Sequence, residues 1–253
     1  AATGFGLGGP TTGLRDLFAG DDYYTDTDSN AYQLPTFLGN HDMGRIGSFL
    51  RTGLPAGTDD TEVLRRDELT HALMYLTRGQ PVVYYGDEQG FVGDGGDKDA
   101  RQDMFPSQVG SYNDDDLIGS DASTAGDNFD PNHPLYRQIA ALSRLRAQHP
   151  ALADGAQIHR YASNEAGIYA FSRIDARDRT EYLVVANNAT GPKTASFDTF
   201  STDGRFRSIY SSFGDGRPLR SDGEGRVTVT VPALSVRVFK ATQTIDRSRQ
   251  APV

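Results

Sequence analysis

The chain has no cysteine, no excess of basic residues and no long hydrophobic run. The absence of cysteine excludes disulfides, thiolate metal sites and a cysteine nucleophile, although it leaves the cellular compartment open. There are 25 lysine and arginine residues against 34 aspartate and glutamate residues, and the net charge of −9 argues against a nucleic-acid partner. No apolar run approaches the roughly 20 residues of a membrane span, so we expect no membrane partner. The first residues show neither the basic nor the apolar part of a signal peptide.

What the sequence contains is sufficient for a large globular core. Its 253 residues are 37% hydrophobic and 10% aromatic, which fits one large domain or two ordinary ones. In the first half, helical and strand-like apolar patterns alternate; Leu69, Ala72, Leu73 and Leu76, for example, follow helical spacing. The patterns predict helices at 12–19, 59–77 and 135–148 and strands at 34–38 and 81–85. This order favours parallel strand–helix units.

After Pro150 the pattern changes to short alternating runs separated by turn-rich pieces. They predict strands at 158–162, 168–172, 182–186, 206–210, 227–231 and 236–239. Such a series is typical of an antiparallel β-sandwich. We therefore divide the chain into an α/β region at 1–150, an all-β domain at 151–241 and a polar tail at 242–253.

The segment 86–134 is long, weakly periodic and rich in glycine and aspartate. Loops of this length in compact domains are usually functional or disordered. Because it follows a predicted strand of a parallel sheet, it lies where α/β proteins place their sites.

The segment 37–45 reads FLGNHDMGR and follows the other predicted strand of this region. His41 and Asp42 then lie at the strand's carboxyl end, where an imidazole beside a carboxylate can serve acid–base chemistry, hydroxyl binding or metal ligation. The alternative is a polar turn in which Asp42 hydrogen-bonds local backbone groups. This segment alone leaves both interpretations open.

A second motif favours the chemical role of His41 and Asp42 over the polar turn. Residues 79–88 read GQPVVYYGDE, and 97–104 follow with DKDARQDM. FLGNHD and GQPVVYYGDE, in this order and with a predicted helix between them, resemble the seventh and eighth barrel strands of the α-amylase superfamily of retaining glycoside hydrolases, with neopullulanase-like features. The resemblance covers about 12–240. It implies the C-terminal part of a (β/α)8 barrel, about its last two strand–helix units, followed by the family's antiparallel β C-terminal domain.

The resemblance also implies roles for the residues of the first motif. Asp42 matches a catalytic carboxylate that does not attack the sugar but binds ring hydroxyls and stabilises an oxocarbenium-like transition state. His41 would donate hydrogen bonds to hydroxyls of the same glucosyl unit. Arg45 would support the loop or contact the next sugar.

Three further residues are expected to bind substrate by the same resemblance. Asp97 and Arg101 match a D-x-x-x-R pair that binds sugar hydroxyls in neopullulanase-like members, and a loop-bracing ion pair is the alternative. Tyr85, at the strand end, would line the pocket or belong to the core.

Two catalytic groups have no match. A retaining enzyme needs a nucleophilic carboxylate and a protonated carboxylic acid about 5–5.5 Å apart, which the family takes from its fourth and fifth barrel strands. The segment 13–16, GLRD, lacks one residue of the family's GxRxD pattern and lies on a predicted helix. We therefore expect that the chain begins near the sixth barrel helix, folds with a second chain that carries the N-terminal part of the barrel, and is inactive alone.

No metal ligand and no required cofactor is assigned, and structural Ca²⁺ is left open. The segment 121–132 begins like a calcium loop but has Ala125 and Asn132 where that loop needs ligands. Clustered acids could still supply oxygen ligands, either Asp94, Asp97, Asp99 and Asp103 or Asp21, Asp22, Asp26 and Asp28. His71 is interpreted as a structural residue of its helix.

The leading functional hypothesis is part of a hydrolase that acts on α-glucan oligosaccharides or polysaccharides. Alternatives are a non-catalytic carbohydrate-binding or scaffold protein of the same fold, and a transglycosylase with the same residues. The absence of tryptophan argues against a starch-binding module, which grips sugars by stacking. The motifs do not specify the preferred linkage, endo or exo action, or localisation, although polymer-degrading amylases are usually exported.

Overall fold

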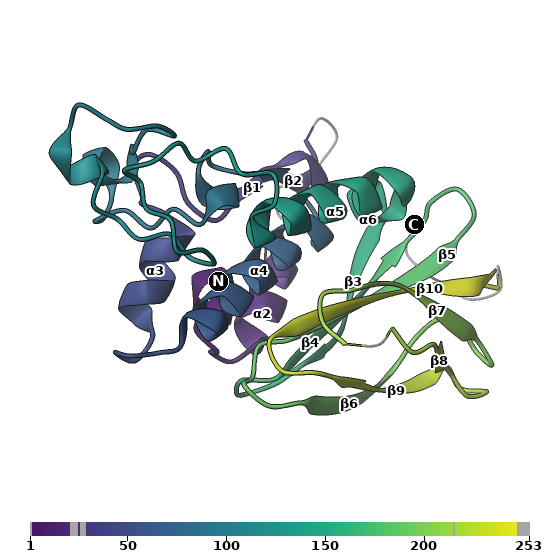
Figure 1. Cartoon of the computed structure of the whole chain (residues 1–253). Helices are drawn as coiled ribbons and strands as arrows, with labels where there is room; N and C mark the ends of the chain where they lie inside the picture. The colour runs from purple at the N-terminus through teal and green to yellow at the C-terminus, as the bar shows by residue number, and fades with distance from the viewer. Residues whose placement is uncertain (1, 21–24, 26–28, 215, 247–253) are drawn as a thin grey trace.

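The computed structural model describes residues 2–20, 25, 29–214 and 216–246. An N-terminal α/β part packs against a C-terminal antiparallel β part, and the long loop 86–134 projects at the end away from the β part (Figure 1). Within the described residues, no helix is long and apolar enough to cross a membrane.

Two short parallel strands organise the N-terminal part. β1 (Pro35–Phe37) pairs in parallel with β2 (Gln80–Val82), with Phe37 opposite Val82. The connection between them contains α3 (Ile46–Gly53) and α4 (Asp60–Leu76), and α5 (Pro134–Gln148) follows the long loop. This arrangement confirms the predicted parallel strand–helix units of a partial barrel.

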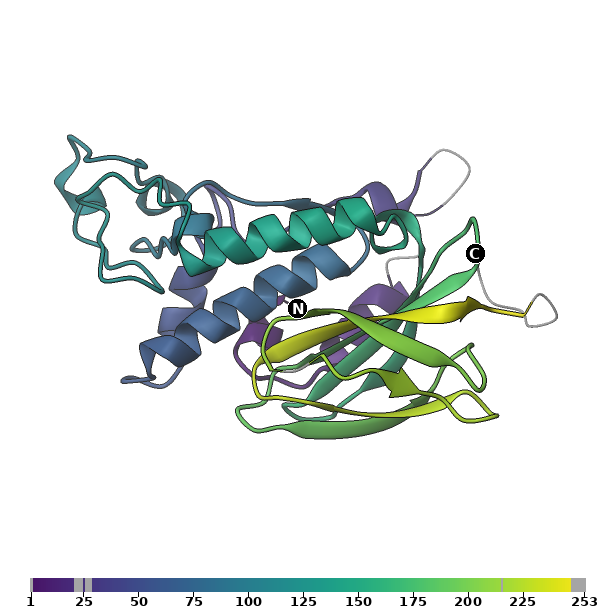
Figure 2. The same cartoon turned by 45° about the vertical axis from the view of Figure 1, so that its right-hand side comes forward.

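Local sequence signals mark where the two long helices begin. Asp59 caps α4 by accepting the N–H of Thr61, and a proline at the first position opens α5. The two helices lie side by side between the β1–β2 pair and the β domain (Figure 2). The remaining helices are short: α1 (Ala2–Gly6), α2 (Thr12–Gly20) and α6 (Ala151–Asp154). Neither α1 nor α3 was predicted, because neither shows an extended apolar repeat.

The C-terminal part is a sandwich of a six-stranded and a two-stranded sheet. The larger sheet has the order β3-β4-β5-β10-β7-β8, and the smaller pairs β6 with β9. Its strands are β3 (Ala156–Ala162), β4 (Ile168–Ile174), β5 (Thr180–Asn187), β6 (Lys193–Asp198), β7 (Arg205–Ser211), β8 (Leu219–Arg220), β9 (Arg226–Val231) and β10 (Ser235–Thr244). The sandwich was predicted, but β6 and β8 were not.

The six-stranded sheet is covered on both faces. Tyr169, Phe171 and Val184 face the α4–α5 layer and share its hydrophobic core, whereas Ala170 and Val185 face the β6–β9 pair. Because both faces are covered, every residue of β4 and β5 is buried instead of every second one, including the charged Arg173 and Glu181. The core is therefore continuous across the expected boundary near residue 150.

The chain end differs from the expected polar tail. β10 continues through Thr244, and Ile245 is only 2% exposed, packed with Ile174. Residues 242–246 therefore extend the β domain, because pairing with β5 and the apolar contact of Ile245 outweigh their polar composition. The rest of the expected tail, 247–253, lies outside the described residues.

Candidate active site

The segment 39–44 forms a tight turn just beyond the carboxyl end of β1. Asn40 Oδ1 accepts the backbone N–H groups of Asp42 at 2.9 Å and Met43 at 2.8 Å. Asn40 and Gly44 also exchange backbone hydrogen bonds at 3.1 and 3.2 Å. A polar turn is therefore present, but the side chain of Asn40 makes it. The Asp42 carboxylate remains available for other contacts, so the turn and a chemical role are compatible.

A loop from far along the chain holds this turn in place. The backbone N–H of Asp97 donates to the Asp42 carbonyl at 3.0 Å. Gly44 has φ +99°, and a Cβ at that position would lie 2.8 Å from the Gly95 carbonyl oxygen. Both the dihedral angle and the close approach require glycine. The position of Asp42 thus depends on the fit between the two loops.

His41, Asp42, Asp97 and Arg101 form one exposed cluster. His41 Nε2 lies 3.3 Å from Asp42 Oδ1, and Arg101 Nη2 lies 2.6 Å from Asp97 Oδ1 and 3.6 Å from Asp42 Oδ1. The side chains of His41 and Asp42 are 58% and 67% exposed. Because solvent screens such pairs, they orient the side chains more than they stabilise the fold. The exposed donors and acceptors are suited to hydroxyl groups of a ligand.

Arg45 lies in the interior and is 0% exposed. Its Nη1 donates to the Tyr85 carbonyl at 2.7 Å and to Asp87 Oδ1 at 3.0 Å, and its Nε donates to Gln102 Oε1 at 2.9 Å. The guanidinium carbon also lies 4.5 Å from the ring centroid of Tyr84. Two roles were expected for Arg45. A side chain without exposed surface does not fit contact with a sugar, but it does fit support of the loops.

A buried series of charges continues from Arg45 towards α4. Burial raises the pKa of Asp87 to about 7, whereas the charges of Arg45 and His71 act in the opposite direction. Burial also disfavours protonation of His71, but its 2.9 Å contact with Asp67 and the charge of Asp87 outweigh this effect and raise its pKa. These groups tie the end of β2 to α4. The structural interpretation of His71 fits its position.

Tyr85 belongs to a different part of the surface. Tyr85 is 42% exposed, and its ring meets that of Tyr84 edge-on, with 4.7 Å between the ring centroids. With Val83, Tyr136 and Ile139 it lines a shallow cavity of about 430 Å³ between the end of β2 and α5. The exposure of Tyr85 does not fit the core alternative, and its role in lining the substrate pocket stays a prediction.

Acidic side chains gather elsewhere in the long loop. Carboxylate oxygens of Asp94, Asp114 and Asp115 lie within 4.8 Å of one another. The pKa of Asp115 is raised, mainly by burial and also by the charges of Asp94 and Asp114. The hydrogen bond from Gln102 acts in the opposite direction. These oxygens are of the type that Ca²⁺ prefers, but three carboxylates supply only part of its usual six to eight ligands. Structural calcium therefore stays a prediction.

The acidic clusters expected from the sequence are not those found. Asp94 belongs to the observed cluster, whereas Asp97 pairs with Arg101. The other expected cluster, Asp21, Asp22, Asp26 and Asp28, lies outside the described residues.

Three supporting residues were missed by the sequence analysis: Asn40, Asp87 and Gln102. Asn40 had a signal, because asparagine often caps the N–H groups two and three residues later. Opposite charges just beyond the ends of neighbouring strands could have suggested the pairing of Arg45 with Asp87. No sequence signal indicates Gln102, whose contacts with Arg45 and Asp115 arise only from the folding of the loop.

Comparison with known proteins matches both parts of the chain. Residues 18–155 match the alpha amylase catalytic domain, and residues 161–242 match the alpha amylase C-terminal all-beta domain. The alpha-amylase of Streptomyces lividans is 53% identical over 235 residues, which are 92% of this chain and 25% of that protein. The cyclomaltodextrin glucanotransferase of Bacillus licheniformis is 25% identical over 232 residues, which are 90% of this chain and 27% of that protein.

The fold agrees with these matches. The alpha-amylase from Geobacillus thermoleovorans, solved in complex with acarbose, aligns with a TM-score of 0.69 at 18% identity, over 96% of this chain and 47% of that chain. The present chain thus spans about a quarter of the length of the two sequence relatives and about half of the solved structure.

Proposed function

The chain belongs to the alpha-amylase family, and we propose that it forms the last part of the catalytic barrel and the C-terminal domain of a retaining enzyme that hydrolyses α-glucosidic bonds in starch-like α-glucans. The observation that carries the proposal is the exposed Asp42 carboxylate just beyond a parallel barrel strand, with His41 and Arg101 beside it. Barrel enzymes place their chemistry at this end of the strands.

Each residue of the cluster has a distinct role in this proposal. Asp42 accepts hydrogen bonds from ring hydroxyls and stabilises the positive charge that develops on the sugar in the transition state. His41 donates to hydroxyls of the same sugar, and Asp97 with Arg101 binds the neighbouring unit. Arg45 contacts no sugar and acts as a positioning residue.

The nucleophile and the general acid come from a portion of the barrel that this chain does not supply. We propose that residues 1–253 are inactive without that portion. Support comes from the β1–β2 pair, where Phe37 and Val82 are register partners and are 42% and 47% exposed. Parallel sheets are normally buried on both faces. An apolar pair on a bare face fits a surface that further barrel strands and side chains cover.

Two relatives support the choice of substrate and suggest a second reaction. The acarbose complex of the structural relative supports an α-glucan oligosaccharide as ligand. The glucanotransferase relative favours transglycosylation as a second candidate, because transfer to a sugar instead of water uses the same covalent intermediate.

The test compares Asp42→Asn with Asp198→Asn in the chain assembled with a barrel portion that carries the nucleophile and acid. Asp198 is also an exposed carboxylate near an arginine, but it lies in the β domain. We expect Asp42→Asn to lower kcat for maltooligosaccharide hydrolysis by at least about 100-fold, since it removes charge stabilisation in the transition state. Both variants should fold like the wild type, because neither carboxylate is buried.

The outcomes separate the alternatives. Near-wild-type hydrolysis by Asp42→Asn contradicts the assignment of Asp42. Calorimetric binding of maltooligosaccharides without release of reducing sugar by the assembled wild type indicates a carbohydrate-binding protein. Longer oligosaccharides among the products indicate transglycosylation.

A further inference from the structure

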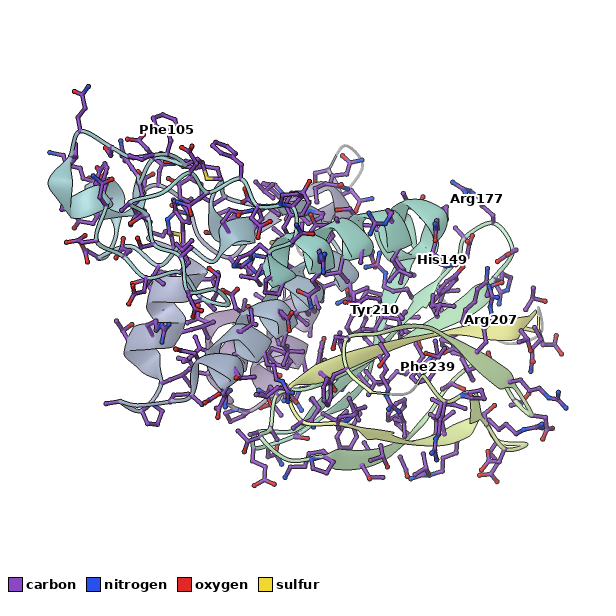
Figure 3. The ribbon with its side chains drawn as sticks, in the orientation of Figure 1. Phe105, His149, Arg177, Arg207, Tyr210 and Phe239 are labelled. Carbon is purple, nitrogen blue, oxygen red and sulfur yellow. The ribbon has the colours of Figure 1, made fainter. Side chains whose placement is uncertain are left out.

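The most exposed apolar side chains lie on the two loops that form the candidate active site. Among the described residues, the three large hydrophobic side chains with the greatest exposure are Phe129 at 64%, Met43 at 54% and Phe105 at 53%. Met43 follows Asp42 in the turn at 39–44, and both phenylalanines belong to the long loop. Figure 3 places Phe105 on that loop, at the end of the molecule opposite the β domain. The greatest apolar exposure is thus found on the loops that carry and support the candidate catalytic carboxylate.

Hydrogen bonds fix the backbone beneath the two phenylalanines. The Asn128 N–H donates to the Met104 carbonyl at 2.8 Å, and each phenylalanine directly follows one of these two partners in the chain. On the other side of Phe129, the backbone of Asp130 exchanges two hydrogen bonds with the buried side-chain amide of Gln89, at 3.0 and 3.1 Å. The two rings are therefore held near each other before any ligand arrives, which lowers the entropic cost of binding.

Neither ring is used inside the protein. Within the part of the chain that the structure describes, no aromatic ring or cationic group stacks on Phe105 or Phe129, and neither packs against a hydrophobic core. Phe213 differs, because the Arg65 guanidinium lies 4.3 Å from its ring centroid. A free aromatic face can stack on the C–H groups of a sugar ring while the sugar hydroxyls stay in water.

The long loop also brings the phenylalanines close to the exposed cluster around Asp42. Arg101 Nη2 lies 3.6 Å from Asp42 Oδ1, and Phe105 is four residues further along the chain. Because an extended chain spans about 3.5 Å per residue, the Cα atoms of Arg101 and Phe105 are at most about 14 Å apart. A short oligosaccharide can bridge this distance. A glucan bound at the cluster can therefore extend to the phenylalanines.

The composition of the loop disfavours anionic and large partners. Residues 91–130 contain ten aspartates but only one lysine and one arginine. This charge repels nucleic acid, anionic lipid and a second copy of the acidic chain. Two rings in a polar loop also supply far less apolar area than the core of a stable protein interface. A neutral chain of sugars meets neither obstacle, and carboxylates accept hydrogen bonds from its hydroxyls.

We propose that Phe105 and Phe129 form an aromatic platform that binds glucosyl units of a long α-glucan beyond those held at Asp42 and Arg101. This inference rests on the proposed function, because it assigns the same substrate to the same end of the strands. The chain has no tryptophan, so stacking on sugars falls to phenylalanine and tyrosine. The platform makes long glucans bind more tightly than short ones, because only a long chain contacts the cluster and the rings together.

Titration of residues 1–253 with maltose and maltoheptaose, followed by NMR, tests the platform directly, because both rings lie within this chain. We expect maltoheptaose to shift the backbone signals of Asn128 and Phe129 in a saturable manner, at lower concentrations than maltose. The absence of a saturable shift with maltoheptaose would overturn the proposal.

Matched substitutions separate stacking from simple apolar contact. Phe129→Tyr keeps a flat ring and should bind maltoheptaose like the wild type. Phe129→Leu and the double variant Phe105→Ala/Phe129→Ala should weaken binding at least about 10-fold, because the stacking face is lost. Phe213→Ala removes an exposed phenylalanine of the β domain and should leave the affinity unchanged. All four variants should fold, since the rings are exposed, and wild-type affinity in the double variant would contradict the platform.

Kinetics of the chain assembled with the barrel portion separate the platform from the proposed function. The double variant should raise KM for long α-glucans at least about 10-fold and leave kcat unchanged, because it removes binding rather than transition-state stabilisation. An unchanged KM overturns the platform while the assignment of Asp42 stands. If Asp42→Asn hydrolyses normally, the catalytic assignment fails, yet maltoheptaose binding that depends on Phe129 still supports the platform. Loss of assembly in the double variant would assign the rings to the interface with the barrel portion and overturn the proposal.

Discussion

Arg45 shows how a single buried side chain can connect the parts of a site without touching a ligand. Its guanidinium joins the carbonyl of Tyr85, the carboxylate of Asp87 and the amide of Gln102, which all come from the segment that follows β2. Arginine suits this role because its planar fork presents donors in several fixed directions. The exposed residues His41 and Asp42 therefore depend on a buried neighbour that lies close to them in the sequence.

We expect Arg45→Met to destabilise the chain by about 3–5 kcal/mol, because it leaves the buried carboxylate of Asp87 without its partner. Asp87→Leu should have a similar effect for the converse reason. The double variant should be less destabilised than the sum of the two single variants, since it leaves neither charge unpaired. Urea unfolding of the four proteins measures these differences. Additive destabilisation would show that Arg45 and Asp87 do not act as a pair.

At the level of elements, the candidate site is a contact between two loops. The turn at 39–44 and the loop at 95–97 meet through backbone atoms, with Gly44 packed against the Gly95 carbonyl. His41 and Asp42 lie in the turn, and Asp97 and Arg101 lie at the two ends of the short 3-10 helix Asp97–Ala100 within the long loop. The parallel strands place the loops at one end of the sheet, and the loop contacts then set the side-chain positions.

Gly44→Ala tests this contact, with Gly57→Ala as its control. Both glycines have positive φ, +99° and +81°, but only Gly44 lies close to other backbone atoms, because a Cβ on Gly57 would meet nothing within 4 Å. We expect Gly57→Ala to cost about 1 kcal/mol for the dihedral angle alone. Gly44→Ala should cost more and should also weaken maltooligosaccharide binding by the assembled protein, measured by calorimetry. Equal effects of the two substitutions would exclude a role for the loop contact.

At the level of the whole molecule, the two faces of the β1–β2 pair differ sharply. One face carries the half-buried residues Thr36 and Pro81, whereas the other face exposes Phe37 and Val82. Both strands also have one edge without a partner among the described strands. Free edges and bare apolar faces promote association with further strands. The β domain, in contrast, covers its larger sheet on both sides.

We expect Phe37→Glu to prevent assembly with the completing barrel portion while changing the stability of the isolated chain by less than about 1 kcal/mol, because the ring is already exposed. Phe213→Glu replaces an equally exposed phenylalanine of the β domain and should leave assembly intact. Co-purification followed by mass spectrometry provides the measurement. Assembly of Phe37→Glu with wild-type affinity would show that the bare face is not the interface.

Local patterns in the sequence determined the class of the fold and its principal elements. The apolar repeat of α4, the alternating runs after Pro150 and the motifs around Asp42 and Tyr85 predicted the two strand–helix units and the β domain. Such features depend on residues close together in the chain, whose spacing the sequence states directly. The motifs also indicated which residues to consider for the site.

Only the tertiary structure decided how deeply each of those residues lies and which distant partner it meets. Arg45 and Asp42 are three positions apart, yet one is fully buried and the other is exposed. The partners Gln102 and Asp97 come from a loop without periodicity, and Gln157 meets Arg173 through strand register. These contacts depend on how loops close and strands pair. They join residues far apart in the chain, so local sequence patterns do not predict them.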